Sequence, residues 1–300
     1  MKISIVTDEI SADPETALEL ARAWGISAVE LRGFGTDRVP AFSSYQKERL
    51  RELLRAYQMQ LIAISPGLFK CTYREERARF PLRTFDHALY QAWEEEQALC
   101  RQHLQELLPR SIAFAEEMAV RRIIIFGFDR GGAPAGPASA GMIDLLRQAA
   151  EQAGAAGVEL LIEVEAGFWA DTGARTAAIV EAVGHPALGI NWDPGNAFEA
   201  GDCPIPEGYL AASAHVRHVH FKDVRQREDG SYQYAVDGDI DWEGQLSALQ
   251  DDGYAGYISI ETHMAPKVAA AYQMVRRLQR LLGREQAEGD YPLTDLSRHF

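Results

Sequence analysis

Short apolar runs alternate with longer amphipathic stretches along the chain, and this alternation predicts strands and helices in regular succession. Runs rich in Val, Ile and Leu predict strands at residues 2–6, 28–31, 61–65, 122–126, 159–163, 188–193, 216–221 and 257–261. Helical periodicity and capping residues predict helices at residues 13–25, 43–57, 84–119, 139–156, 172–183, 207–214, 242–251 and 267–282.

This succession favours an α/β fold. The predicted strands are apolar on both faces, which is typical of a parallel sheet buried on both sides. Repeated strand–helix units of this number and size predict a (β/α)8 TIM barrel in a single domain, with an open doubly wound sheet as the alternative. No shift in composition marks a domain boundary, so the barrel is expected to occupy residues 1–283. The polar segment 284–300 predicts a C-terminal tail that packs on the surface or at an oligomer interface, which leaves a homodimer open.

Two segments predict loops outside the regular alternation. Residues 131–137 read GGAPAGP and cannot hold regular structure, so they form either a lid over the site or a plain connector. Residues 226–240 are polar and rich in glycine, and they predict an excursion with a hairpin around Asp229 and Gly230.

Candidate chemistry gathers at the ends of the last four predicted strands. These strands end on Glu163, Asp193, His220 and Glu261, and a loop follows each. In a (β/α)8 barrel the C-terminal strand ends form the active site, and these four strands are neighbours around half of the mouth. Nitrogen and oxygen ligands of this kind suit one divalent metal ion with an open position for substrate.

Side-chain alternation leaves a choice within three of these strands. Glu163 is preferred to Glu165 because it lies within the apolar strand, where its orientation is fixed. Asp193 is preferred to the asparagine two residues earlier, because an amide is a weak ligand. His220 is preferred to His218 because it is closer to the strand end. A single strand-end carboxylate is often a helix N-cap or a surface ion pair, but four in series favour a shared site.

Composition and charge narrow the class of protein. The 300 residues carry a formal net charge of −14, which argues against nucleic-acid binding but leaves phosphorylated small molecules open. No GxGxxG follows the first strand and no P-loop motif occurs. No run approaches the length of a membrane span, and the start of the chain does not predict a signal peptide. The scattered cysteines, Cys71, Cys100 and Cys203, predict no disulfide framework and a cytoplasmic location.

The chain resembles the xylose isomerase-like barrel superfamily, a group of sugar-phosphate isomerases and epimerases, in its successive segments IEVEAG, NWDPGN, VRHVHFKD, GDIDW and GYAGYISIETH. The resemblance extends from the VELR of residues 29–32 to Glu261. It implies that Glu163, Asp193, His220 and Glu261 bind one divalent metal ion. In the ketose 3-epimerases of this group the two glutamates are also the acid and base, which implies catalytic roles for Glu163 and Glu261.

The resemblance implies a metal-dependent isomerase or epimerase of a sugar or sugar phosphate. Removal of a proton next to a carbonyl gives an enediolate, which a divalent ion stabilises and a carboxylate can form or reprotonate. Mn²⁺ is preferred, with Zn²⁺, Co²⁺ or Mg²⁺ open. An inosose dehydratase-like lyase acting on a polyol-derived ketone is the first alternative. An endonuclease IV-like repair enzyme is the second, but it needs histidines where this chain has Ser65-Pro66-Gly67 and Phe126-Gly127-Phe128. A non-catalytic barrel is the third.

Further polar residues near the predicted strand ends are candidate substrate contacts. Lys222 and Arg225 could hold a phosphate or carboxylate, although Lys222 could equally pair with its neighbour in sequence. The remaining candidates are Glu30, Arg32, Asn196 and His263. Glu30 and Arg32 could instead pair with each other. Some ketose epimerases of the similar family carry histidine where this chain has Asn196, which weakens the case for a strict 3-epimerase.

Overall fold

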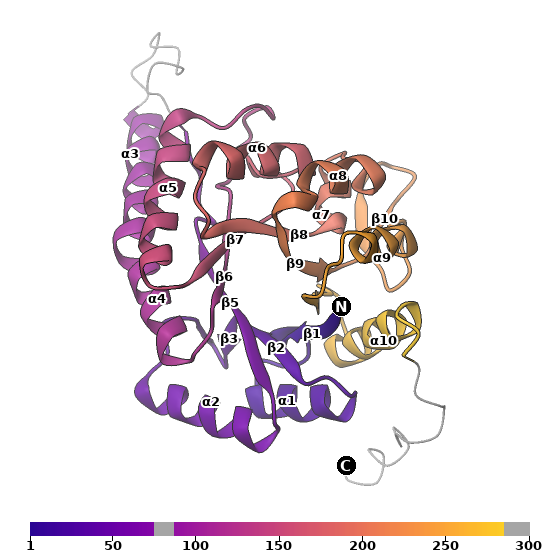
Figure 1. Ribbon diagram of the computed structural model, residues 1–300. Helices are drawn as coiled ribbons and strands as arrows, with labels where there is room; N and C mark the ends of the chain where they lie inside the picture. The colour runs from indigo at the N-terminus through magenta and orange to yellow at the C-terminus, as the bar shows by residue number, and fades with distance from the viewer. Residues whose placement is uncertain (75–86, 285–300) are drawn as a thin grey trace.

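Eight parallel strands close into a barrel in the computed structural model, which describes residues 1–74 and 87–284 (Figure 1). The strands are β1 (Lys2–Val6), β2 (Ala28–Leu31), β5 (Gln60–Leu68), β6 (Arg122–Phe126), β7 (Glu159–Glu163), β8 (Leu188–Trp192), β9 (Val216–Phe221) and β12 (Tyr257–Ile260). They follow one another around the barrel in chain order, and β12 pairs with β1 to close it. The predicted (β/α)8 barrel is therefore confirmed.

Helices surround the barrel as an outer ring (Figure 1). They are α1 (Pro14–Ala23), α2 (Ser44–Ala56), α3 (His87–Gln102), α4 (Leu108–Glu117), α5 (Ala140–Ala155), α6 (Gly173–Val183), α7 (Pro194–Glu199), α8 (Tyr209–Ala212), α9 (Trp242–Asp251) and α10 (Lys267–Leu281). Shorter helical turns lie at η1 (Thr7–Glu9), η3 (His103–Leu107), η4 (Pro204–Gly208) and η5 (Ser213–His215). Side-chain caps such as Asp13 before α1 and Ser43 before α2 mark where these helices begin.

Strand alternation separates two layers of apolar side chains. Ile124 and Leu161 pack with Ala28, Ile62 and Ala63 in a small cluster. The residues next to them in β6 and β7 belong to the larger core between the strands and the helices. The small cluster therefore fills the inside of the barrel, and in β6 and β7 every second residue faces it. In β5 both Ile62 and Ala63 belong to the cluster, where the register against β2 shifts. By this alternation Glu163 faces the barrel interior above Leu161.

Three predicted elements differ from the structure. The helix predicted over 207–214 is reduced to α8, which lies between the turns η4 and η5. The third predicted strand was expected to end at Ser65, but β5 continues to Leu68, with an irregular register against β6 between Ile64 and Leu68. Proline is tolerated at such an irregularity because no ladder hydrogen bond is needed there. The helix predicted over 84–119 is divided by the π-helical turn η3, and Pro109, which lacks an N–H, lies just after it. The first residues of that predicted helix lie outside the described residues.

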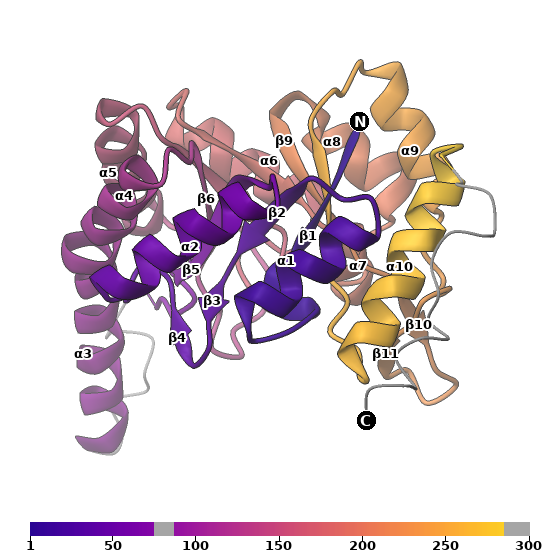
Figure 2. The ribbon, with the colours of Figure 1, turned by 90° about the horizontal axis from the view of Figure 1, so that it is seen from below.

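Two small hairpins lie at the C-terminal end of the barrel strands, away from the N-terminus (Figure 2). One pairs β3 (Gly33–Phe34) with β4 (Asp37–Arg38), and the other pairs β10 (Val224–Gln226) with β11 (Tyr232–Tyr234). The second confirms the predicted hairpin around Asp229 and Gly230. The first was not predicted, because strands of two residues leave no periodic pattern.

The predicted tail, apart from Arg284, lies outside the described residues, and a homodimer stays a prediction. Among residues 1–74 and 87–284, no helix combines the length and apolar character that crossing a membrane requires.

The start of α6 depends on a close backbone approach. A Cβ atom at Gly173 would lie 1.9 Å from the carbonyl oxygen of Gly208, so alanine there must displace η4. We expect Gly173→Ala to lower the free energy of unfolding by about 3 kcal/mol, measured by urea denaturation. Gly136→Ala is the control, because a Cβ at Gly136 meets nothing within 4 Å. Equal denaturation midpoints for the two variants would show that the close contact between Gly173 and Gly208 does not require glycine at position 173.

Candidate metal centre

The four predicted ligands come together inside the C-terminal mouth of the barrel. Glu163 is the last residue of β7, Asp193 follows β8, His220 lies in β9 and Glu261 follows β12. One ligand atom from each lies within 4.8 Å of the others, and all four residues are buried. Register contributes to this convergence, because parallel pairing places Ser259 beside His220 and Glu163 beside Asn191.

The histidine ring is at the centre of the group. His220 Nδ1 lies 3.3 Å from Glu163 Oε1, 3.4 Å from Glu261 Oε2 and 3.9 Å from Asp193 Oδ2. Among the described residues this nitrogen has no well-directed hydrogen bond, whereas the Glu261 and Asp193 oxygens share one cation, Lys222 Nζ. Three buried carboxylates that face one such nitrogen fit a bound cation, because buried polar atoms are nearly always partnered. The chemistry of the set, three carboxylates and one imidazole, suits a divalent metal ion.

Glu30 fixes the orientation of His220 from below. Its Oε2 atom accepts hydrogen bonds from the Nε2 atoms of His218, at 3.0 Å, and His220, at 3.2 Å. Burial opposes the charge on Glu30, but the two histidines outweigh it and lower the pKa of Glu30 well below its ordinary value. An ionised carboxylate only accepts hydrogen bonds, so both Nε2 atoms carry hydrogen. With Nε2 directed at Glu30, Nδ1 is the His220 nitrogen that faces the carboxylates and would bind a metal. Burial opposes a charge on His220, but Glu30, Glu163 and Glu261 raise its pKa well above the ordinary value.

Glu30 therefore does not lie where the sequence analysis expected it. It was a candidate for bonding sugar hydroxyls, but its side chain is fully buried beneath the ligands. The alternation of β2 explains the position, because Glu30 shares the interior face with Ala28.

Asp193 has two roles at once. Its Oδ1 atom accepts a hydrogen bond of 2.9 Å from the backbone N–H of Asn196 and so caps α7. Its Oδ2 atom remains directed at the cluster. The sequence left open whether Asp193 is a helix N-cap or a metal ligand. The structure shows the N-cap, and the second oxygen of Asp193 is still available to a metal.

Lys222 lies inside the ligand group. Its Nζ atom is 2.9 Å from Asp193 Oδ2 and 2.8 Å from Glu261 Oε2, and its side chain is 1% exposed. Burial lowers the pKa of Lys222, but Asp193 and Glu261 outweigh burial and raise the pKa well above the ordinary value. The alternative left open by the sequence, a pair of Lys222 with its neighbour Asp223, is not formed, because Asp223 pairs with Arg277 instead. Lys222 follows His220 by two residues, so strand alternation already indicated the interior face.

Arg32 and His263 hold the other side of Glu261. Arg32 Nη1 lies 2.5 Å from Glu261 Oε1, and the same guanidinium binds Asp8 and Glu9. The alternative pair of Arg32 with Glu30 is therefore not formed. His263 Nε2 lies 3.4 Å from Glu261 Oε2 with a side chain 34% exposed, so this predicted substrate contact is at the rim of the cluster.

Two other predicted contacts lie in different surroundings. Asn196 is buried, donates to Val164 O and Glu165 Oε2, and accepts from Lys222 Nζ at 3.0 Å, so its side chain is used internally. Arg225 has a side chain that is 58% exposed and bonds the Asp237 carbonyl on the β10–β11 excursion. The structure does not bring Arg225 to the cluster.

Sequence reasoning missed Glu199 and Tyr234. The ring of Tyr234 in β11 packs 5.2 Å from that of His263. Burial raises the pKa of Tyr234, and its charged neighbours include Lys222 and Asp193. Burial also raises the pKa of Glu199, whose Oε1 atom has no hydrogen-bond partner. Tyr234 therefore borders the rim of the centre beside His263, and Glu199 ends α7, the helix that Asp193 caps. No local motif marks either one.

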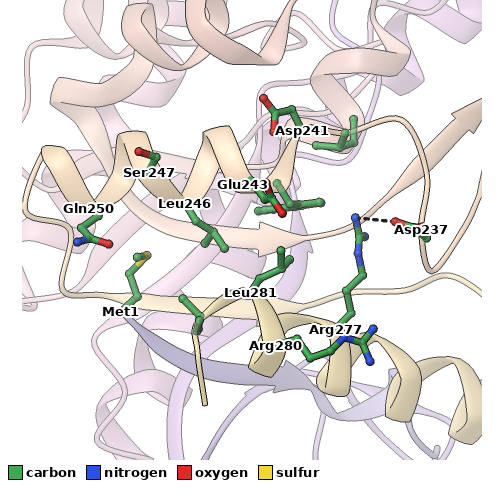
Figure 3. Close-up of a pocket in the computed structure, with 13 residues that line it drawn as sticks. Met1, Asp237, Asp241, Glu243, Leu246, Ser247, Gln250, Arg277, Arg280 and Leu281 are labelled. Carbon is green, nitrogen blue, oxygen red and sulfur yellow. Dashed lines mark ion pairs between the residues drawn. The ribbon is translucent and has the colours of Figure 1, made fainter. Parts of the chain in front are cut away.

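A pocket of about 820 Å³ lies outside the barrel between α9 and α10 (Figure 3). Arg277 and Asp237 form an ion pair of 3.3 Å across its edge. None of the four predicted ligands lines this pocket, so it is separate from the candidate centre.

The chain is similar to known proteins with the same barrel fold. A family model described as "Xylose isomerase-like TIM barrel" matches residues 18–281. Inosose dehydratase from Lacticaseibacillus casei is 22% identical over 153 residues, 46% of this chain and 51% of that protein, so the match spans about half the relative's length. L-ribulose-5-phosphate 3-epimerase UlaE from Salmonella paratyphi A is 24% identical over 245 residues, 81% of this chain and 80% of that protein. The crystal structure of the probable 3-DHS dehydratase AsbF from Bacillus anthracis superposes with a TM-score of 0.66 at 16% identity, covering 93% and 99% of the two chains.

The closed barrel and the buried acidic–histidine cluster define a TIM-barrel protein with a candidate metal centre. The chain belongs to the xylose isomerase-like TIM barrel family, because the family model covers most of its length. The resemblance inferred from the sequence is thereby confirmed, and the similar proteins are an epimerase and dehydratases.

Glu30 should control metal affinity without touching the metal. We expect Glu30→Gln to weaken Mn²⁺ or Zn²⁺ binding by about 10- to 100-fold, because a neutral amide no longer fixes the Nε2–H form of His220. Calorimetric titration of metal into apoprotein measures this. Glu228→Gln, on the exposed turn of the hairpin, is the matched control. Unchanged affinity in Glu30→Gln would separate Glu30 from the centre.

Lys222 should stabilise the metal-free protein. Lys222→Met leaves Asp193 and Glu261 without their buried cation, so we expect the apoprotein to lose about 3–5 kcal/mol of unfolding free energy. Saturating Mn²⁺ should restore much of this loss, as followed by urea denaturation with and without metal. Lys47→Met, which removes a surface pair with Glu117, is the control. A loss that metal does not reduce would contradict charge compensation.

Proposed function

We propose that this protein is a divalent-metal-dependent isomerase or epimerase of a sugar or sugar phosphate that works through an enediolate. One observation carries the proposal: Glu163, Asp193, His220 and Glu261 are buried and each offers a ligand atom within 4.8 Å of the others inside the barrel mouth. The similarity to an L-ribulose-5-phosphate 3-epimerase over most of the chain supports the same class.

The proposed ligands are Glu163, Asp193, His220 and Glu261. A divalent ion at this point supplies electrostatic stabilisation of the negative charge that develops on the substrate oxygens. Mn²⁺ is the preferred ion, and Zn²⁺, Co²⁺ or Mg²⁺ fit the same donor types.

Glu163 and Glu261 are the proposed acid and base. They project from β7 and β12, with β8 and β9 between them, so a substrate in the mouth has one carboxylate on each side. One carboxylate takes the proton next to the carbonyl, and return of a proton on the other face inverts that carbon. Lys222 and Arg32 keep Glu261 ionised, because burial raises the pKa of Glu261 but its cationic neighbours, led by Lys222 and His220, lower it well below the ordinary value.

Dehydration is the second candidate function. About half of the inosose dehydratase from Lacticaseibacillus casei is similar in sequence to this chain. The same enediolate can also lose a β-hydroxyl, and that loss is a dehydration. Glu199 and Tyr234 border the centre and offer groups that could protonate a leaving hydroxyl. Nothing favours the endonuclease alternative: β5 has Ser65 and β6 ends with Phe126, where histidines are required.

Proton exchange tests the proposal directly. With Mn²⁺ bound, we expect the protein to exchange the proton next to the carbonyl of a ketose with deuterated water, detected by NMR. Glu163→Gln and Glu261→Gln should each slow this exchange by about 10²- to 10⁴-fold, because each removes a proton acceptor. Metal content of each variant is measured in parallel by elemental analysis.

Glu243→Gln, an exposed substitution at the start of α9, is the control and should exchange at the wild-type rate. Product analysis then separates epimerisation and isomerisation from dehydration. A wild-type protein that takes up no divalent metal would overturn the proposed function. Full exchange by both glutamine variants would remove only their acid and base roles.

A further inference from the structure

One guanidinium at the mouth of the barrel has no acidic partner among the described residues. Arg32 and Lys222 are held by carboxylates of the cluster, and Lys70, beyond the end of β5, lies 3.0 Å from Glu165. Arg38 in β4 forms no ion pair in the described chain. Arg38 is exposed, so its charge is available to an anion that enters the mouth of the barrel.

Arg38 reaches from its hairpin to the end of a barrel strand. Its Nε and Nη2 atoms donate to the carbonyl oxygen of Ser65 in β5, at 3.2 and 3.1 Å. The guanidinium also lies against Gly67, where a Cβ would be 3.4 Å from Arg38 Nε. Two of the five guanidinium N–H groups are thus used, and the others have no partner among residues 1–74 and 87–284. The contact with Ser65 orients the guanidinium at the C-terminal end of β5, the end of the barrel where the β3–β4 hairpin lies (Figure 2).

The β3–β4 hairpin places Arg38 near the candidate centre but not in it. Arg38 pairs with Gly33, which follows Arg32 in the chain. The Val39 N–H donates to the Arg32 carbonyl oxygen at 3.0 Å. Arg32 in turn binds Glu261, one of the proposed ligands, whereas Arg38 itself is exposed. A purely structural tie to Ser65 requires a hydrogen-bond donor but no net charge, so the tie alone does not explain an arginine here.

We propose that Arg38 binds an anionic group of the substrate, a phosphate or a carboxylate remote from the reacting carbonyl. This inference rests on the proposed function, in which the carbonyl end lies at Glu163 and Glu261. A guanidinium fork matches the paired oxygens of either anion. Lys222 and Arg225, which the sequence suggested for this task, are unsuited, because one is buried in the cluster and the other lies on the outer hairpin.

The test compares three ligands on Mn²⁺-loaded protein by calorimetry: ribulose, ribulose 5-phosphate and 5-ketogluconate. We expect at least one of the two anions to bind tenfold or more tightly than neutral ribulose, and the stronger anion identifies phosphate or carboxylate. Arg38→Met should remove that preference while leaving ribulose affinity unchanged. Arg38→Lys should keep part of it, because the charge remains but the fork is lost.

Arg22→Met is the matched control, because Arg22 lies in the last turn of α1 and bonds Gln58. It should keep the wild-type preference. Three outcomes overturn the inference: no anion preference in wild type, a preference that survives in Arg38→Met, or equal weakening of all three ligands, which indicates a structural role. Failure of all three ligands to bind metal-loaded wild type also counts against it.

A second measurement needs no variant and separates this inference from the proposed function. Phenylglyoxal should modify Arg38 in the wild-type protein, with the site mapped by mass spectrometry, and the preferred anion should protect it more than ribulose does. Protection without metal binding or proton exchange would support the anion contact while the proposed function fails. Metal binding and proton exchange without protection would leave the proposed function intact and remove Arg38 from it.

Discussion

Compensation of buried negative charge is the constraint on which the rest of the centre depends. Glu163, Asp193 and Glu261 gather around His220 in the barrel interior, where unmatched charge is costly. Two neighbouring cations meet this cost: Lys222 lies between two of the carboxylates, and Arg32 binds the far oxygen of Glu261. These cations do not balance all of the negative charge around His220 Nδ1, and a divalent ion would supply the missing positive charge.

The same residues hold the fold and the centre together. Asp193 caps α7 with one oxygen and faces the cluster with the other, and Glu30 supports two histidines with a single oxygen. Substitution of either residue therefore changes stability and site geometry at the same time. Such sharing limits how far the centre can be stabilised without changing its chemistry.

The sequence was sufficient for the fold and for the four residues that converge, because both follow from regular patterns. Apolar runs located the strands, and alternation within each strand separated interior from exterior positions. Long-range packing accounts for what was missed. Strand alternation places Lys222 on the interior face, but no local pattern shows that it pairs with two of the ligands, that Glu30 lies beneath His220, or that Arg225 remains outside on a hairpin. Glu199 and Tyr234 reach the centre only through the path of α7 and of that hairpin.

The proposed metal ligands and the proposed anion contact come from different halves of the chain. The proposed ligands all come from β7, β8, β9 and β12, whereas Arg38 and Lys70 come from segments before β6. Under the proposed function, reaction chemistry and anion recognition are encoded in separable stretches of the chain, so selection could alter one while retaining the other. Glu30 and Arg32 connect the two halves: both lie in the first half of the chain, and they contact His220 and Glu261 in the second half. A recombination between two family members would conserve the centre only if this short VELR segment matched its new partner.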